Sequence, residues 1–124
     1  MSINKVILLG YTGKDPEVKD VAGTKVANLS LATTEKGYTL QNGIQVPDRT
    51  EWHSLIFWKG LAEVVEKYVR KGSQIYIEGK IKTRQYEDRT GSKRYVTEIF
   101  VDKLELLGSR LAQQEASPQS KLYQ

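Results

Sequence analysis

Cysteine is absent from the 124 residues, and histidine occurs once. Without cysteine the chain cannot form a disulfide framework, a thiolate metal site or a thiol nucleophile. A lone histidine on an aromatic stretch, as His53 is, is more often structural than catalytic. The sequence also lacks a glycine-rich phosphate loop ahead of a helix, a metal-ligand spacing of His, Asp and Glu, and a Ser-His-Asp set. We therefore expect no enzyme activity, no metal and no cofactor.

Long apolar runs are missing as well. The N-terminal run, residues 5–9, is short and has no cleavage-like site after it, so we expect neither a signal peptide nor a transit peptide. No stretch has the roughly 20 apolar residues that a membrane-spanning helix needs. These absences favour a cytoplasmic protein without a membrane partner. The length favours a single domain with a core of its own.

Acidic residues are slightly outnumbered, with 15 Asp and Glu against 19 Lys and Arg, which gives a net charge of +4. A charge of this size does not by itself indicate a nucleic-acid partner. The basic residues cluster at 70–71, at 80–84 and at 93–94. They would form one basic surface only if the fold brought these segments together.

Alternation of apolar and polar residues predicts the first strands. The branched apolar run 5–9 and the alternating segment 25–33 are two strands, and a brief extension, Glu17–Val21, lies between them. Residues 34–50 contain two glycines, a proline and the pair Asn42-Gly43. This composition predicts either a long loop or a protruding hairpin with an Asn-Gly turn.

The third predicted strand, residues 51–58, is the most aromatic stretch of the chain. Trp52 and Trp58 share one parity, whereas His53 and Phe57 take the other. If the histidine side forms the core, two indoles lie on the surface, and exposed rings of that size are costly unless something covers them. If the tryptophan side forms the core, both rings are structural. Spacing leaves the two alternatives open.

The second half of the chain begins with a helix. Apolar residues at i, i+3, i+4, i+7 and i+8 predict a helix over residues 59–72, ended by Gly72. In residues 74–86 apolar and polar side chains then alternate, which predicts a strand with one apolar face. The far half of its other face carries Lys80, Lys82, Arg84 and Tyr86. A polar turn over 87–94 leads to the last strand, 95–107.

The predicted order is therefore three strands, a helix and two strands. This is the order of a five-stranded OB-fold, an all-β Greek-key barrel with one helix between strands three and four. We expect this domain to occupy residues 1–109 and residues 110–124, which have little apolar content, to form a flexible tail. On this fold the aromatic strand, the loop 34–50 and the turn 87–94 border one groove. Rings and cations in one groove are typical of a binder of single-stranded nucleic acid without sequence preference.

The sequence also resembles the bacterial-type single-stranded DNA-binding proteins (SSB). The motifs that carry the resemblance follow the family order from about residue 3 to residue 108. They are N-K-V-I-L-L-G (4–10), D-P-E-V (15–18), V-A-N-L-S-L-A-T (26–33), T-E-W-H (50–53), L-A-E-V (61–64), Y-V-R-K-G-S-Q-I-Y-I-E-G (68–79) and T-R-Q-Y (83–86).

The resemblance implies an OB-fold homotetramer, a dimer of dimers, that wraps single-stranded DNA during replication, repair and recombination. The residues expected to stack on bases are Tyr38, Trp52, Trp58 and Tyr86. The residues expected to contact phosphates are Lys59, Arg70, Lys71, Lys82, Arg84 and Arg94. Those expected at subunit contacts are His53, Gln74 and Tyr76. Arg70 and Lys71 would equally suit the negative end of the helix dipole, which is a structural role.

The end of the chain departs from the family pattern. Family members usually end in a flexible linker and an acidic tip with a terminal Pro-Phe pair, which recruits partner enzymes, whereas this chain ends in S-K-L-Y-Q. Either the chain is a truncated or mobile-element version, or its recruitment of replication and repair proteins is lost or different. Two other hypotheses are an RNA-binding or primosome-type OB module and an OB scaffold that binds protein.

Overall fold

The computed structural model describes residues 1–107, so the predicted tail over residues 110–124 lies outside the described residues. Within this range the chain forms eight strands and one helix. In chain order these are β1 (Val6–Thr12), β2 (Glu17–Val21), β3 (Thr24–Glu35), β4 (Tyr38–Thr39), β5 (Gln45–Val46), β6 (Arg49–Trp58), α1 (Gly60–Tyr68), β7 (Gln74–Glu87) and β8 (Lys93–Leu107).

Five of these strands close into a barrel. The sheet order is β1-β7-β8-β6-β3-β2, and an additional pairing of β1 with β3 joins the two sides. The ladder between β6 and β8 is parallel, whereas the other ladders are antiparallel. This confirms the predicted all-β OB-fold, with the helix between the third and fourth barrel strands. The strand count is higher than predicted because β2 lies along the edge of β3 and because β4 and β5 form a separate two-stranded sheet.

The core consists of the inward-facing residues of the barrel and one face of α1. Its largest fully buried side chains are Phe57, Leu31, Leu55, Ile75, Ile77, Val65 and Val69. Helix α1 contributes Ala62 and Val65 and covers one end of the barrel. Because β6 sends Leu55 and Phe57 into this core, the histidine-side parity of the strand is the inner one.

The helix is shorter than predicted, since it ends at Tyr68 rather than Gly72. Val69 is already extended, with φ −93° and ψ 132°. The next residues are tied to the end of β1: the Thr12 hydroxyl donates to the Arg70 carbonyl at 2.6 Å, and the Ser73 amide donates to the Thr12 hydroxyl at 3.0 Å. These hydrogen bonds replace the helical ones and turn the chain into β7.

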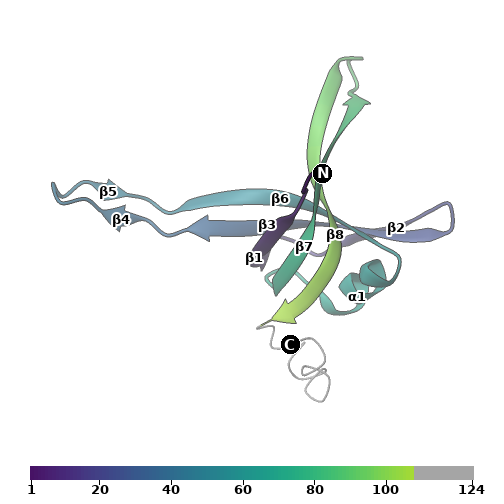
Figure 1. The fold of residues 1–124 in the computed structure, drawn as a ribbon, viewed down its shortest axis with the longest axis horizontal. Helices are drawn as coiled ribbons and strands as arrows, with labels where there is room; N and C mark the ends of the chain where they lie inside the picture. Colours follow the sequence, from purple (N-terminus) through teal and green to yellow (C-terminus); the bar gives the residue numbers. More distant parts are fainter. Residues whose placement is uncertain (108–124) are drawn as a thin grey trace.

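Two hairpins project from the barrel in different directions (Figure 1). One is the arm formed by β4 and β5, which continues the long β3–β6 ladder and ends in the Asn42-Gly43 turn. The Asn42 side chain accepts a hydrogen bond from the Ile44 amide at 3.1 Å, and Gly43 has φ 85°, which favours glycine. Of the two sequence alternatives for residues 34–50, the structure therefore has the protruding hairpin. The other projection is the far half of β7 and β8.

The strand β7 changes its surroundings at Gly79. Its ladder with β8 shifts register between Glu78 and Gly79, so that these two residues face Lys103 and Val101. A Cβ on Gly79 would lie 2.4 Å from the Phe100 carbonyl oxygen, which shows how closely the two backbones approach. Before this bulge β7 belongs to the barrel wall, and after it β7 forms the projecting hairpin with β8.

Within residues 1–107, no helix combines the length and the apolar character required to cross a membrane.

Candidate nucleic-acid interface

The outer face of β6 carries both tryptophans. Trp52 is 61% exposed and Trp58 is 40% exposed, whereas Leu55 and Phe57 on the opposite face are fully buried. The alternative that spacing left open is therefore settled in favour of two surface indoles. Along the strand the rings are separated by Ser54 and Ile56, so they form two platforms on one face.

Trp58 belongs to an aromatic cluster that the sequence analysis missed. Its ring stacks on Phe100 of β8, with a centroid distance of 6.4 Å and an interplanar angle of 26°. The Lys82 ammonium lies 4.5 Å from the centroid of the Phe100 ring. The signal in the sequence was the alternation of residues 95–107, which places Phe100 on the face opposite the buried Ile99 and Val101.

Trp52 lies against the backbone after β1. A Cβ built on Gly13 would lie 2.5 Å from Cζ3 and 2.7 Å from Cη2 of the indole. Gly13 is held in place because its amide donates to the Ser30 carbonyl at 3.0 Å. The absence of a side chain at residue 13 therefore allows the Trp52 ring to occupy this position.

Between the two platforms the surface contains a polar hollow of about 260 Å³. Its lining residues are Lys14, Glu17, Asn28, Leu29, Ser30, Ser54, Leu55, Arg84 and Glu98. Arg84 Nε donates to Glu98 Oε1 at 2.8 Å, and this hydrogen bond together with the charge of Glu98 raises the pKa of Arg84. The Glu98 side chain is almost covered, whereas that of Arg84 remains largely exposed.

The outer face continues onto the β7–β8 hairpin. The Arg84 guanidinium carbon is 5.9 Å from the centroid of Tyr86, and Tyr86 is paired across the hairpin with Arg94. Arg94 Nε in turn donates to Asp88 Oδ2 at 2.9 Å. Hydrogen bonds from the Thr90 hydroxyl and from Arg94 lower the pKa of Asp88 to about 2. Lys82 is thus linked to Trp58 through Phe100, and Arg84 lines the hollow beside Ser54, whereas Tyr86 and Arg94 lie farther along the projecting hairpin.

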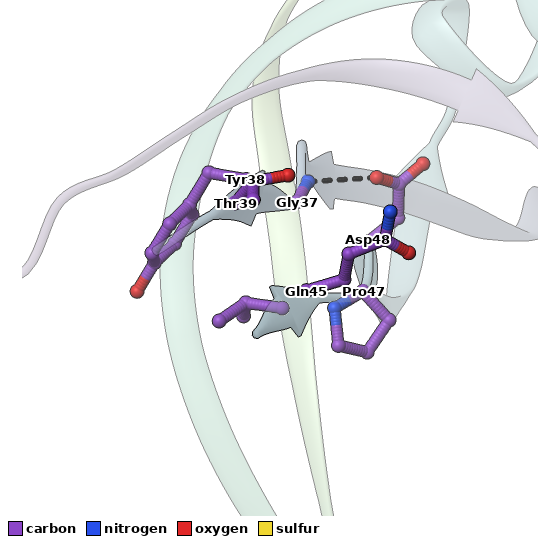
Figure 2. A pocket seen from close by; sticks show the side chains of 7 residues that line it. Gly37, Tyr38, Thr39, Gln45, Pro47 and Asp48 are labelled. Atoms are coloured by element: carbon purple, nitrogen blue, oxygen red, sulfur yellow. Dashed lines mark hydrogen bonds between the residues drawn. The ribbon is translucent and has the colours of Figure 1, made fainter. Parts of the chain in front are cut away.

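Tyr38 lies apart from this face, on the projecting arm. Its ring is 61% exposed and borders an open hollow of about 520 Å³ formed by residues 37–39 and 45–48. Figure 2 shows the ring extending away from the hydrogen bond between the Gly37 amide and Asp48 Oδ1, which measures 2.7 Å. This hydrogen bond ties the two sides of the arm together at its base, next to Tyr38.

The remaining basic candidates surround the helix. Lys59 directly follows Trp58 at the start of α1, with φ 54°. The Arg70 guanidinium turns back to the helix end and donates to the carbonyls of Glu66 and Val69, at 2.9 and 2.7 Å. Lys71 is anchored by its amide, which donates to Asp15 Oδ1 at 2.8 Å. The structure thus gives Arg70 a capping contact at the negative end of the dipole, the structural alternative stated above.

Of the candidates for subunit contacts, Gln74 and Tyr76 lie on the near half of β7 beside β1, and His53 lies on β6. Gln74 and Tyr76 are paired with Tyr11 and Leu9 of β1, and on β1 the exposed side chains are Ile7, Leu9 and Tyr11. His53 lies on the inner side of β6, where its Nε2 is 2.9 Å from the Thr33 hydroxyl. Thr33 lines a hollow of about 280 Å³ together with Ile7 and Leu9, so His53 is linked to this hollow through Thr33.

A carboxylate network borders the patch. The Tyr76 hydroxyl donates to Glu78 Oε2 at 2.5 Å, and the Lys5 ammonium lies 2.7 Å from Glu78 Oε1. The hydrogen bond from Lys5 is the largest cause that lowers the pKa of Glu78, and the hydrogen bond to Glu78 raises the pKa of Tyr76. The ion pair of Lys5 and Glu78 therefore lies beside the exposed Ile7, with which Glu78 is paired across the strands.

Known proteins of one family resemble this chain in sequence and in fold. The model of the single-strand binding protein family matches residues 3–107. A single-stranded DNA-binding protein of Bacteroides thetaiotaomicron is 56% identical over 111 residues, which cover 89% of this chain and 69% of that protein. Among solved structures, the Plasmodium falciparum SSB complex with ssDNA is similar with a TM-score of 0.78 at 30% identity, covering 87% of this chain and 97% of that chain. The chain described here belongs to the single-strand binding protein family.

Proposed function

We propose that this protein binds single-stranded DNA on the outer face of β6, β8 and β7, without catalysing a reaction. The observation that carries the proposal is the alignment on one face of Trp52, the Trp58–Phe100 pair and the cations Lys82 and Arg84. Membership of the single-strand binding family and the similarity to a protein solved with ssDNA support it.

The chemistry of the face explains why binding would depend weakly on sequence. Every base has a flat ring that can stack on an exposed indole, and each such stack is worth about 1–3 kcal/mol. Every nucleotide also has a phosphate, which Lys82 can neutralise with release of counterions. Tyr86, Lys59, Lys71 and Arg94 extend the surface for further nucleotides, and Tyr38 extends it onto the arm.

We further propose that the protein acts as a homotetramer, a dimer of dimers. The support is the apolar patch of Ile7, Leu9 and Tyr11 beside Gln74 and Tyr76, which a monomer would leave in water. Sedimentation at equilibrium tests this, and a single species of about 14 kDa would contradict it. Protection of single-stranded DNA during replication, repair and recombination, in the cytoplasm with the nucleoid, is the role that fits such an assembly.

Titration with oligo-dT, followed by tryptophan fluorescence, tests the binding proposal. Stacking on Trp52 and Trp58 should quench the emission and saturate at a fixed stoichiometry. Unchanged emission at low salt would contradict the proposal. Competition between DNA and RNA of equal length and sequence separates a DNA-binding protein from an RNA-binding OB module, because the latter would bind the RNA more tightly.

A further inference from the structure

A carboxylate lies at the centre of the proposed DNA-binding face. Glu98 and Ser54 directly precede Ile99 and Leu55, which are paired in the parallel β6–β8 ladder, so both side chains point outward at one level. Ser30 is paired with Ser54 on the next strand. Glu98 is 7% exposed, and it therefore forms part of the floor of the hollow between the tryptophans rather than its rim.

A buried carboxylate is unexpected on a surface that binds a polyanion, because its charge opposes the phosphates. The ion pair with Arg84 occupies only one of the two carboxylate oxygens of Glu98 with a short hydrogen bond. Glu98 Oε1 accepts from Arg84 Nε at 2.8 Å, but Oε2 is 3.5 Å from Arg84 Nη2, which is a weak contact. An ionised carboxylate can accept at both oxygens, so Oε2 keeps the capacity to accept from a ligand.

Besides the charged Lys14, Glu17 and Arg84, the hollow is lined by neutral polar groups suited to the edge of a base. Asn28, Ser30 and Ser54 carry both donors and acceptors, and all three line the same cavity of about 260 Å³. Ser54 lies between the two tryptophans along β6. The hollow that contains Glu98 therefore lies beside the stretch of β6 between the two stacking platforms.

We propose that this hollow recognises the exocyclic amino group of a base, with Glu98 Oε2 as its acceptor, so that cytosine is preferred to thymine at this position. The inference rests on the proposed function and gives its stacking surface one point of base selectivity. Cytosine presents the N4 amino group, which carboxylates accept in other nucleic-acid complexes. Thymine presents the O4 carbonyl at the same place, and two acceptors would face each other.

The test compares binding of dT and dC oligonucleotides of equal length by wild-type protein and by Glu98→Gln. The two oligonucleotides carry the same number of phosphates, so the electrostatic contribution cancels in the ratio Kd(dT)/Kd(dC). We expect Glu98→Gln to lower this ratio about tenfold, as loss of a charged acceptor should. The control is Glu87→Gln, which removes the same charge from an exposed residue at the end of β7 and should leave the ratio unchanged.

Removal of a negative charge strengthens binding of both oligonucleotides, and this general effect is separated from base recognition by the ratio. If both Kd values fall equally and the ratio stays at its wild-type value, Glu98 only weakens binding through the repulsion between its charge and the phosphates, and the inference is wrong. If the wild-type protein binds neither oligonucleotide, the proposed function itself fails.

A second measurement leaves the protein unchanged, in case Glu98→Gln does not fold. An oligonucleotide of 2-pyrimidinone deoxyriboside has the cytosine ring without its 4-amino group. We expect wild-type protein to bind it about tenfold more weakly than dC, because Glu98 then has no amino donor to accept from. Equal affinity for the two would overturn the inference.

Discussion

Replacement of Gly13 by alanine should weaken DNA binding although it alters no charged or stacking side chain. The added Cβ would lie 2.5 Å from the Trp52 ring, whereas carbon atoms in contact prefer about 3.5–4.0 Å. The indole must therefore move by about 1 Å. The backbone at Gly13 is outside the left-handed region, so alanine fits its conformation, and the ring that has to move is the exposed end of a side chain. We expect the protein to fold with little change in stability.

The loss of affinity follows from the value of one stack. A base on an aromatic ring contributes about 1–3 kcal/mol, and a ring displaced by 1 Å should lose part of this contact. We expect a cost of about 1 kcal/mol, which corresponds to roughly a fivefold increase in Kd for oligo-dT. The salt dependence should not change, because no phosphate contact is lost.

Fluorescence titrations of Gly13→Ala at several salt concentrations measure both quantities. Gly60→Ala is the matched control, since a Cβ at that glycine meets no atom within 4 Å. If Gly13→Ala binds with wild-type affinity, Trp52 does not stack on a base in this position. A change in the salt slope would also refute the reasoning, because it would show that phosphate contacts had moved.

Three further predictions concern charge, pH and packing. Lys82→Ala should reduce the slope of log K against log salt by about one, since one phosphate contact is removed; an unchanged slope would show that the ammonium stays over Phe100 in the complex. The pKa of Asp88 is about 2, against an ordinary 3.8. The stabilisation of the hairpin tip by ionised Asp88 should therefore be complete above about pH 4 and be lost as the pH falls through 2. The pH dependence of the NMR shifts of Arg94, its ion-pair partner, measures this titration, and a midpoint near 3.8 would contradict the prediction. Gly79→Ala should destabilise the fold by about 1–3 kcal/mol, because its Cβ meets a backbone carbonyl; an unchanged thermal midpoint would contradict the close approach.

The barrel could be predicted because alternation along a strand directly reports which side chains are buried. Residues 25–33 have one clearly apolar face, and the structure buries it in the barrel. On residues 74–86 the structure buries Ile75, Ile77 and Gly79 of the apolar face, whereas Ile81 and Thr83 are exposed. The aromatic strand could not be oriented in this way, because large apolar side chains occur at both parities. In the structure Phe57 packs in one core cluster with Ala62 and Val65 of α1, and spacing along the strand alone does not reveal this contact.

The roles of individual cations depend on contacts that the alternation of residues along a strand does not show. Arg84 binds Glu98, 14 residues away across the hairpin, and a single strand gives no indication of that pair. Arg70 stays a predicted phosphate contact, and in the structure its guanidinium caps two carbonyls that the early end of α1 exposes. Phe100 owes its place in the aromatic cluster to Trp58 and Lys82 on the neighbouring strands, which the alternation of its own strand does not reveal.

The two halves of β7 support two separate proposals, and the bulge at Gly79 explains how one strand can carry both. The strand has the same parity throughout, so Tyr76 and Glu78 lie on the same side of the ribbon as Lys82 and Arg84. A flat strand would therefore present all four to one partner. The register shift after Glu78 increases the local bend and twist, which directs the near half toward β1 and its apolar patch and the far half toward Phe100 and the tryptophans. A change in the DNA-binding half, such as Lys82→Ala, should consequently leave subunit assembly intact. Because Gly79 lies between the two halves, Gly79→Ala is the substitution expected to impair assembly and DNA binding together.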